Sequence, residues 1–220
     1  MKRNMKFKTL IFDLDGTLLD TITDLANAVN HALTVHGYPT HAEAEYLRMV
    51  GNGIASLVAR ALPGGKENPD FSAVLATFRA YYEIHKADAT APYAGISEML
   101  LTLDAAGLSL AIVSNKIDPA VKALAARFFP DTVRVAVGER EGIDRKPAPD
   151  TVYLALAELG VTAEGAAYIG DSEVDIETAK NAGLPCLSVG WGFRTEEELR
   201  AAGADRVFMT PDELCRYLMD

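Results

Sequence analysis

The sequence predicts an α/β fold, a Rossmann-like parallel sheet with helices on both faces, together with an inserted α-helical domain. Short apolar runs that end at polar or glycine-rich breaks recur along the chain and are typical of buried strands. Segments with helical spacing lie between these runs, and strands that alternate with helices pair in parallel through right-handed crossovers. One long stretch, in contrast, has helical spacing throughout and no strand pattern.

The predicted strands are the apolar runs Thr9–Phe12, Leu108–Val113, Val133–Val137, Ala166–Ile169 and Cys186–Val189. The helices predicted between them are Ser97–Ala106, Pro119–Phe128, Pro149–Leu159 and Asp175–Ala182. Gly107, Gly160 and Gly183 directly follow three of these helices, where glycine is a stop signal. Ligands of such sheets bind at the carboxyl ends of the strands, so polar residues that follow a strand are candidates for the site.

The stretch from about Thr23 to Lys86 is the one without strands, and it predicts a helical domain inserted after the first strand. We expect residues 1–20 and 90–220 to form the α/β Rossmann-like catalytic core and residues 21–89 to form the α-helical cap domain. The two connections between them would allow the cap to move.

Composition excludes several partners. The 21 basic and 31 acidic side chains give a net charge of −10, and an acidic surface repels the phosphates of nucleic acid. No apolar run approaches the length of a membrane span, and the basic start of the chain is followed by too short a run for a signal peptide. We therefore expect a cytoplasmic enzyme with neither nucleic-acid nor membrane partners. Composition does not determine its oligomeric state, and we expect a monomer or a homodimer.

Two carboxylates follow the first strand, in the run Asp13, Leu14, Asp15, Gly16, Thr17. They are two residues apart where the chain leaves the sheet, so both can point into one cleft. Gly16 tolerates unusual dihedral angles, and the amides after it can bind an anion. Taken alone, acidic residues beside a glycine are more often an ordinary turn.

Three further polar clusters come later in the chain, two of them at predicted strand ends. Their presence favours a functional role for the cluster Asp13–Thr17 over an ordinary turn. They are Ser114-Asn115-Lys116, Lys146-Pro147, and Gly170-Asp171-Ser172 with Asp175. In this order and context, DLDGTLLD, SNK, KPAP and GDSEVD resemble the four motifs of the haloacid dehalogenase-like hydrolase superfamily. The helical insert is similar to the C1-type cap of that superfamily. The run FFPDTVRVAVGEREGIDRKPAPD resembles its phosphoglycolate phosphatase-like branch.

The resemblance implies a Mg²⁺-dependent phosphatase that hydrolyses a small phosphate monoester, with 2-phosphoglycolate as the best guess. Phosphoryl transfer requires an in-line nucleophile and neutralisation of the phosphate oxygens. Asp13 is the expected nucleophile, which forms an aspartyl phosphate, and Asp15 the expected acid and base. By resemblance, Asp13 also lends a carboxylate oxygen to Mg²⁺ and Asp15 its main-chain carbonyl. Asp171 is the third oxygen ligand.

The remaining candidates surround this centre. Asp175, one helical turn after Asp171, would act on the metal through water or by orienting its neighbours. Lys146 would bring positive charge to the phosphate and keep Asp13 ionised. The residues expected to bind phosphate or substrate are Gly16, Thr17, Ser114, Asn115, Gly51, Asn52 and Gly53.

The last three of those residues lie in the insert, before an apparent helix Ile54–Leu62 and near Arg48. Their free amides could hold a substrate carboxylate, although a plain turn between helices fits as well. Trp191 and Phe193 follow the last predicted strand, and packing over the sheet edge is the better interpretation of them. Arg194, next to them, could reach the rim of the cleft.

Rival functions share the fold, so particular residues decide between them. A dehalogenase needs neither an acid such as Asp15 nor Mg²⁺. A phosphonate hydrolase needs a Schiff-base lysine, and neither Lys66 nor Lys86 lies in an evidently apolar setting. A sugar phosphomutase uses the same two aspartates and remains the main alternative. A phospho-aspartate signalling or binding module is a further alternative, against which Asp15 and a dedicated cap argue.

Overall fold

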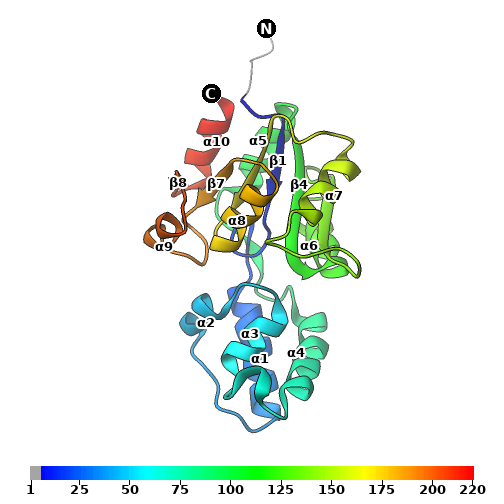
Figure 1. Cartoon of the computed structure of the whole chain (residues 1–220), viewed down its shortest axis with the longest axis vertical. Helices are drawn as coiled ribbons and strands as arrows, with labels where there is room; N and C mark the ends of the chain where they lie inside the picture. The colour runs from blue at the N-terminus through cyan, green and yellow to red at the C-terminus, as the bar shows by residue number, and fades with distance from the viewer. Residues whose placement is uncertain (1–5) are drawn as a thin grey trace. The chain divides into compact units, whose positions relative to one another are not determined.

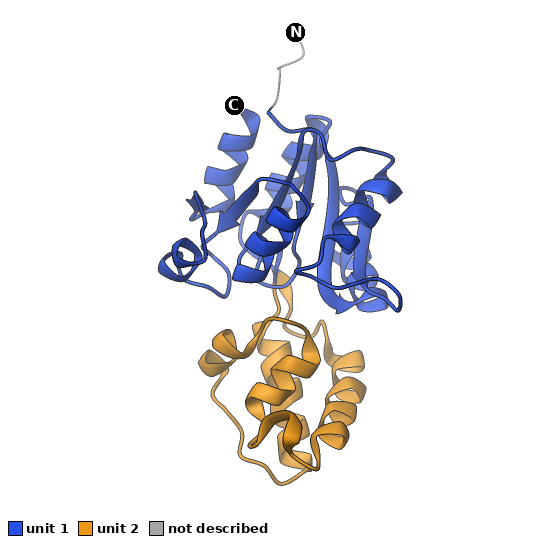
Figure 2. Ribbon diagram, viewed as in Figure 1, with its two compact units in different colours: residues 1–19, 92–220 blue, residues 20–91 orange. Residues whose placement is uncertain are grey.

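The computed structural model describes residues 6–220, which form two compact units. One unit runs to Leu19 and resumes as Pro92–Asp220, and the other spans Asp20–Ala91 (Figure 2). Residues 1–5, which the sequence assigned to the catalytic core, lie outside the described residues. The chain passes between the units through β2 (Leu19–Asp20) and β3 (Ala91–Pro92), which pair as a two-stranded sheet.

The first unit contains a six-stranded sheet in the order β5-β4-β1-β6-β7-β8 (Figure 1). Its strands are β1 (Thr9–Phe12), β4 (Ser109–Ile117), β5 (Val135–Glu139), β6 (Ala166–Gly170), β7 (Cys186–Val189) and β8 (Val207–Phe208). Each adjacent pair is parallel. The α/β prediction is therefore confirmed. Strand β8 was not predicted, because two residues are too few to show a pattern.

The helices of this unit are α5 (Ile96–Ala105), α6 (Asp118–Phe128), α7 (Asp150–Leu159), α8 (Glu173–Asn181), α9 (Glu196–Ala201) and α10 (Pro211–Met219). Ile11 of β1 and Val113 of β4 lie in one buried cluster with Val152 of α7 and Ala179 of α8. Successive strand residues face opposite sides, so the other side of the sheet is covered separately. There, α5 packs against β4 and against α10.

The strand order places the candidate site. β1 lies between β4 and β6, with Phe12 opposite Ile112 on one side and Ile169 on the other. The chain runs outward from β1 in both directions, which makes the carboxyl end of β1 a topological switch point where ligands of open α/β sheets bind. The residues that follow β1, the later part of β4 and the end of β6 are consequently neighbours.

Strand β4 is longer than the sequence indicated. The apolar run ends at Val113, but the extended backbone continues to Ile117, and pairing with β5 is irregular between these two residues. Hydropathy ended the predicted strand at the polar Ser114, because a polar residue breaks the apolar pattern without ending the strand. The Ser-Asn-Lys cluster is therefore part of β4.

The second unit is helical, with α1 (Ile22–Val35), α2 (Glu43–Met49), α3 (Ile54–Ala61), a 3₁₀ turn η1 (Gly65–Glu67) and α4 (Phe71–His85). Its core contains Val29 and Leu33 of α1, Val58 of α3, and Val74 and Phe78 of α4, all fully buried. Within residues 6–220, no helix combines the length and apolar character needed to cross a bilayer.

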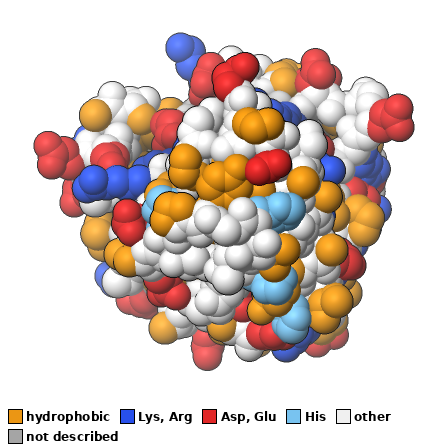
Figure 3. All heavy atoms as spheres, turned by 90° about the horizontal axis from the view of Figure 1, so that it is seen from below, with side chains coloured by type: hydrophobic (Ala, Val, Ile, Leu, Met, Phe, Trp, Pro, Cys, Tyr) orange, Lys and Arg blue, Asp and Glu red, His pale blue; other side chains and the backbone are white. Residues whose placement is uncertain are grey.

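The chain's four histidines, His31, His36, His41 and His85, all belong to this helical unit. The rings of His31 and His85 stack on Tyr81, with centroid separations of 4.1 and 4.2 Å. His36 forms a 2.9 Å hydrogen bond with the Thr77 hydroxyl of α4. Histidine side chains lie among hydrophobic ones on the surface in Figure 3. The rings of His31 and His36 thus connect α1 and its C-terminal end to α4, whereas His85 stacks on a residue of its own helix.

Candidate active site

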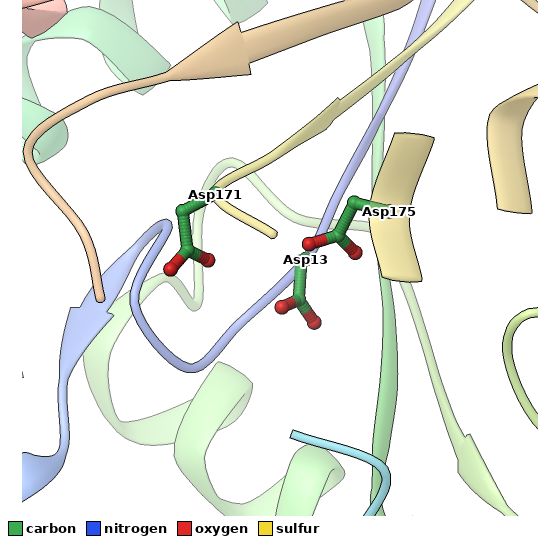
Figure 4. Close-up of side chains that lie close together, drawn as sticks. All are labelled: Asp13, Asp171 and Asp175. Carbon is green, nitrogen blue, oxygen red and sulfur yellow. The ribbon is translucent and has the colours of Figure 1, made fainter. Parts of the chain in front are cut away.

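Three carboxylates converge at the carboxyl edge of the sheet (Figure 4). Asp13 directly follows β1, Asp171 directly follows β6, and Asp175 lies in the first turn of α8. Each contributes an oxygen within 4.8 Å of the others, and all three are buried. In the part of the chain that the structure describes, this is the group of acidic, histidine or cysteine side chains that could hold a metal ion.

The electrostatics of this group fit a cation with oxygen ligands. Burial raises the pKa of Asp13 well above its ordinary value, Lys146 opposes this, and the charges of Asp175 and Asp171 reinforce it. Burial, followed by the charge of Asp175, raises the pKa of Asp171 to about 7. The site therefore holds more negative charge than its surroundings offset. A divalent cation, which prefers carboxylate oxygens, would remove that imbalance.

Lys146 lies between two of the carboxylates. Its Nζ is 2.8 Å from Oδ1 of Asp13 and 2.8 Å from Oδ1 of Asp175. Burial lowers the pKa of Lys146, but the two carboxylates more than offset this effect and raise it well above its ordinary value. The structure thus places a permanent positive charge beside the predicted nucleophile.

Asp175 contacts protein donors on both oxygens. Besides Lys146, Oδ1 accepts a hydrogen bond from the Tyr168 hydroxyl at 3.2 Å. Its Oδ2 accepts from the backbone N–H and hydroxyl of Ser172 at 3.1 and 2.6 Å. Asp175 therefore orients Lys146 and the start of α8. Sequence reasoning did not identify Tyr168, although a tyrosine in an apolar strand signals a buried hydroxyl that needs a partner.

Asp15 forms an ion pair with a lysine to which the sequence gave no role. Nζ of Lys116 lies 2.9 Å from Oδ1 of Asp15, at an angle that does not make a well-aligned hydrogen bond. Lys116 is only 5% exposed. A buried lysine requires a charged partner, but the sequence could not show which carboxylate it meets.

Gly16 and Thr17 lie directly against Asp171. Gly16 has φ +86°, and a side chain there would overlap the Asp171 carboxylate. The Thr17 hydroxyl donates a 2.9 Å hydrogen bond to Oδ1 of Asp171. The sequence predicted phosphate binding for Thr17, whereas in the structure its hydroxyl orients a carboxylate of the candidate metal site.

Ser114 and Asn115 belong to β4, the neighbour of β1. Ser114 is 2% exposed, and its hydroxyl oxygen accepts a 3.3 Å hydrogen bond from the Lys116 N–H. The Asn115 side-chain amide donates to the Lys146 carbonyl at 3.0 Å. Among the described residues, Oδ1 of Asn115 is buried without a partner. Both residues lie towards the carboxyl end of β4, and phosphate binding by them stays a prediction.

Gly51, Asn52 and Gly53 form a turn of the helical unit that precedes α3. They have successive φ angles of +122°, +58° and +78°. The Arg60 guanidinium donates to the carbonyls of Met49 and Gly51 at 2.6 and 2.9 Å, which fixes the turn. Arg48 lies nearby in sequence and is exposed.

The edge of the parallel sheet thus combines buried carboxylates with a buried lysine, an arrangement suited to transfer of a phosphoryl group to an aspartate. A model of the haloacid dehalogenase-like hydrolases matches residues 10–189, and the chain belongs to that family.

Several relatives of this chain are phosphatases. An N-acetylmuramic acid 6-phosphate phosphatase of Pseudomonas aeruginosa is 32% identical over 99% of this chain and 97% of its own length. A phosphoglycolate phosphatase of Rhodospirillum rubrum is 35% identical over 91% of this chain and 86% of its own. A solved protein of Lactobacillus delbrueckii subsp. bulgaricus, provisionally described as a phosphoglycolate phosphatase, is 34% identical, with a TM-score of 0.93 over 97% of this chain and 99% of its own. The predicted family and branch are confirmed.

Proposed function

We propose that this chain is a Mg²⁺-dependent phosphatase that hydrolyses a small phosphate monoester through an aspartyl phosphate on Asp13. The observation that carries the proposal is the position of Asp13. Its carboxylate lies at the centre of the sheet edge, paired with Lys146 and grouped with Asp171. A nucleophilic carboxylate can approach a phosphate dianion only where positive charge offsets the repulsion.

The reaction has two steps. An oxygen of Asp13 attacks phosphorus while the bond to the leaving alkoxide oxygen breaks, and Asp15 donates a proton to that oxygen. Water then attacks the phosphorus of the aspartyl phosphate and gives a proton to Asp15. The bond from phosphorus to Asp13 breaks, which releases inorganic phosphate and restores both aspartates.

The other residues bind and orient. Lys146 places its charge beside the phosphate oxygens, and Ser114, Asn115 and the amides after Gly16 donate hydrogen bonds to them. The cation would be held by Asp13, Asp171 and the main-chain carbonyl of Asp15. When bound, Mg²⁺ would offset negative charge on the transferring phosphoryl group.

The substrate class follows from chemistry that the relatives share. Phosphoglycolate and N-acetylmuramic acid 6-phosphate are both phosphate monoesters that carry a carboxylate. We therefore propose a phosphorylated carboxylic acid, with 2-phosphoglycolate as the first candidate. Binding of its carboxylate by Gly51, Asn52 and Gly53 stays a prediction, as do the cytoplasmic location and the monomeric or homodimeric state.

The test is phosphate release by the purified chain from 2-phosphoglycolate, N-acetylmuramic acid 6-phosphate and glucose 1-phosphate, with Mg²⁺ or with EDTA. Asp13→Asn is the control, because it removes the nucleophile at nearly constant volume. Release that is lost in EDTA and in the variant supports the proposal. Conversion of glucose 1-phosphate to glucose 6-phosphate without release would indicate a mutase. An aspartyl phosphate that persists for minutes would indicate a signalling module.

A further inference from the structure

The loop Gly190–Arg194, which follows β7, contacts the candidate metal site. The sequence favoured simple packing over the sheet edge for its aromatic residues. In the structure, the Trp191 indole N–H donates a 2.9 Å hydrogen bond to the main-chain carbonyl of Thr17. The backbone N–H of Phe193 donates a 2.8 Å hydrogen bond to Oδ2 of Asp171. This loop, which we call the 190–194 loop, therefore contacts both Thr17 in the turn after β1 and the Asp171 carboxylate.

These contacts form a continuous chain from Trp191 to Asp171. Thr17, fully buried, accepts the indole N–H at its carbonyl, and its hydroxyl donates to Oδ1 of Asp171. The backbone N–H of Phe193 donates to Oδ2 of the same carboxylate. Both oxygens of Asp171 thus receive a hydrogen bond from a fixed donor, and one of these donors is itself held by Trp191.

The centre of the 190–194 loop packs tightly against the turn after β1 and against Asp171. A side chain at Gly192 would overlap the Gly16 carbonyl oxygen and the Asp171 carboxylate. Beyond it, the Arg194 guanidinium pairs with Glu173 of α8, with Nε 2.9 Å from Oε2. The loop is therefore fastened to the turn after β1, to Asp171 and to α8.

We propose that Trp191 is a positioning residue that acts through Thr17 to orient Asp171 for a divalent cation, and so tightens binding of that cation. The inference rests on the proposed function of the site. A carboxylate oxygen has two lone pairs, so each oxygen of Asp171 can accept its hydrogen bond and still face a metal. Donors that fix a ligand before binding reduce the ordering cost when the metal arrives.

The burial of Asp171 supports this arrangement. Asp171 is only 1% exposed, and each of its carboxylate oxygens accepts a hydrogen bond from a donor that the fold holds in place, Thr17 at Oδ1 and Phe193 at Oδ2. The 190–194 loop supplies the Phe193 donor directly and holds the Thr17 donor through Trp191. Both contacts therefore help to orient the Asp171 carboxylate.

The experiment is calorimetric titration of the substrate-free chain with Mg²⁺ alone. Trp191→Phe removes the indole N–H and keeps an aromatic ring, so we expect binding to weaken by about 2- to 10-fold, the range of one neutral hydrogen bond.

Thr17→Val removes the hydroxyl and should weaken binding, whereas Thr17→Ser keeps the hydroxyl and should bind nearly as wild type. The double variant Trp191→Phe with Thr17→Val should bind no more weakly than Thr17→Val alone, because Trp191 acts through Thr17. Wild-type affinity in Trp191→Phe, or fully additive losses, would overturn the inference.

Asp171→Asn separates this inference from the proposed function. If Asp171→Asn binds Mg²⁺ as tightly as wild type, the metal site itself is wrong. If Asp171→Asn loses binding while Trp191→Phe does not, only the positioning role fails.

A second readout needs no substitution at Trp191, which is the only tryptophan of the chain. Its emission in the wild type should change on Mg²⁺ addition and saturate at the calorimetric Kd, and the change should be absent in Asp171→Asn. A wild type that binds Mg²⁺ with no change in emission counts against a link between Trp191 and the site.

Discussion

Nζ of Lys116 lies 2.9 Å from Oδ1 of Asp15, so the predicted acid and base is held by a lysine that is 5% exposed. The pair joins the end of β4 to the turn after β1, two segments about 100 residues apart in sequence. Removal of the ammonium would leave the Asp15 side chain free to take other orientations.

We expect Lys116→Met to lower kcat by about 10- to 100-fold with a smaller change in KM, because a misplaced general acid loses much of its effect. Steady-state kinetics with 2-phosphoglycolate measure this. Lys122→Met is the matched control, since Lys122 also pairs with an aspartate, Asp118, but its side chain is 53% exposed. The control should remain close to wild type. Equal kcat in both variants would show that Lys116 does not orient Asp15.

Lys146 should matter for stability as well as for turnover. Its ammonium pairs with Asp13 and Asp175 at 2.8 Å each, and all three side chains are buried. Lys146→Met leaves both carboxylates without that partner, which costs about 3–5 kcal/mol for a buried pair. Urea denaturation in EDTA would measure the loss. The exposed Lys180→Met should leave the urea midpoint near wild type, and a Lys146 variant that matches it would contradict the ion-pair assignment.

Asp171 predicts a pH dependence of stability in the metal-free chain. Burial raises the pKa of Asp171 from 3.8 to about 7, so between these pH values the folded state binds the proton more tightly than the unfolded state. The contribution of Asp171 to the free energy of unfolding therefore falls as pH rises from about 4 to 7, and the destabilisation is fully present above 7. Asp171→Asn, which carries no charge, should remove this slope.

Ionised Asp171 lowers the free energy of unfolding by an amount on the order of a few kcal/mol above pH 7. Asp171→Asn should therefore melt at a higher temperature than the wild type in EDTA at pH 8. Thermal melts across pH 4 to 8 in EDTA test the sign. With Mg²⁺ added, the wild type should gain stability and the variant should not. A metal-free wild type that becomes more stable from pH 4 to 7, with the variant parallel to it, would contradict the prediction.

Much of the α/β core could be predicted because its signals are local. The predicted runs for β1 and β7 end at the same residues as the strands, and the run for β6 ends one residue early, at Ile169 instead of Gly170. Asp13 directly follows β1, and Asp171 directly follows β6. Parallel topology then implies that these strand ends meet, without any knowledge of side-chain contacts.

The contacts that the sequence did not show depend on long-range geometry. Lys116 is a polar residue beyond an apolar run, and only the continued strand β4 brings it to Asp15. Asp175 has the spacing of a residue near the metal, yet its oxygens meet Lys146 and Ser172. The Trp191 indole signals a hydrogen bond, but its partner is a main-chain carbonyl, which no sequence pattern can identify.

Gly138 of β5 packs closely against the backbone of Lys116 and Asp118. Its N–H donates a 3.0 Å hydrogen bond to Oδ1 of Asp118, and a Cβ built on it would lie 2.5 Å from both the Lys116 carbonyl oxygen and Cα of Asp118. Its φ is not in the left-handed region, so the glycine is required by space and not by backbone angle. Close packing of β5 against this segment thus depends on the missing side chain.

We expect Gly138→Ala to destabilise the chain by about 1–3 kcal/mol, the cost of overpacking, although alanine in an open site would stabilise it by about 0.4–1 kcal/mol. It should also lower kcat, because the backbone that carries Lys116 must shift. Ala136→Gly on the same strand is the control, since it weakens β5 by about 0.5–1 kcal/mol without adding an atom near Lys116. Urea denaturation gives the sign of the stability change and steady-state kinetics give kcat for both variants. If Gly138→Ala stabilises the chain, β5 has room there. If it destabilises the chain but keeps kcat as the control does, the position of Lys116 does not limit turnover.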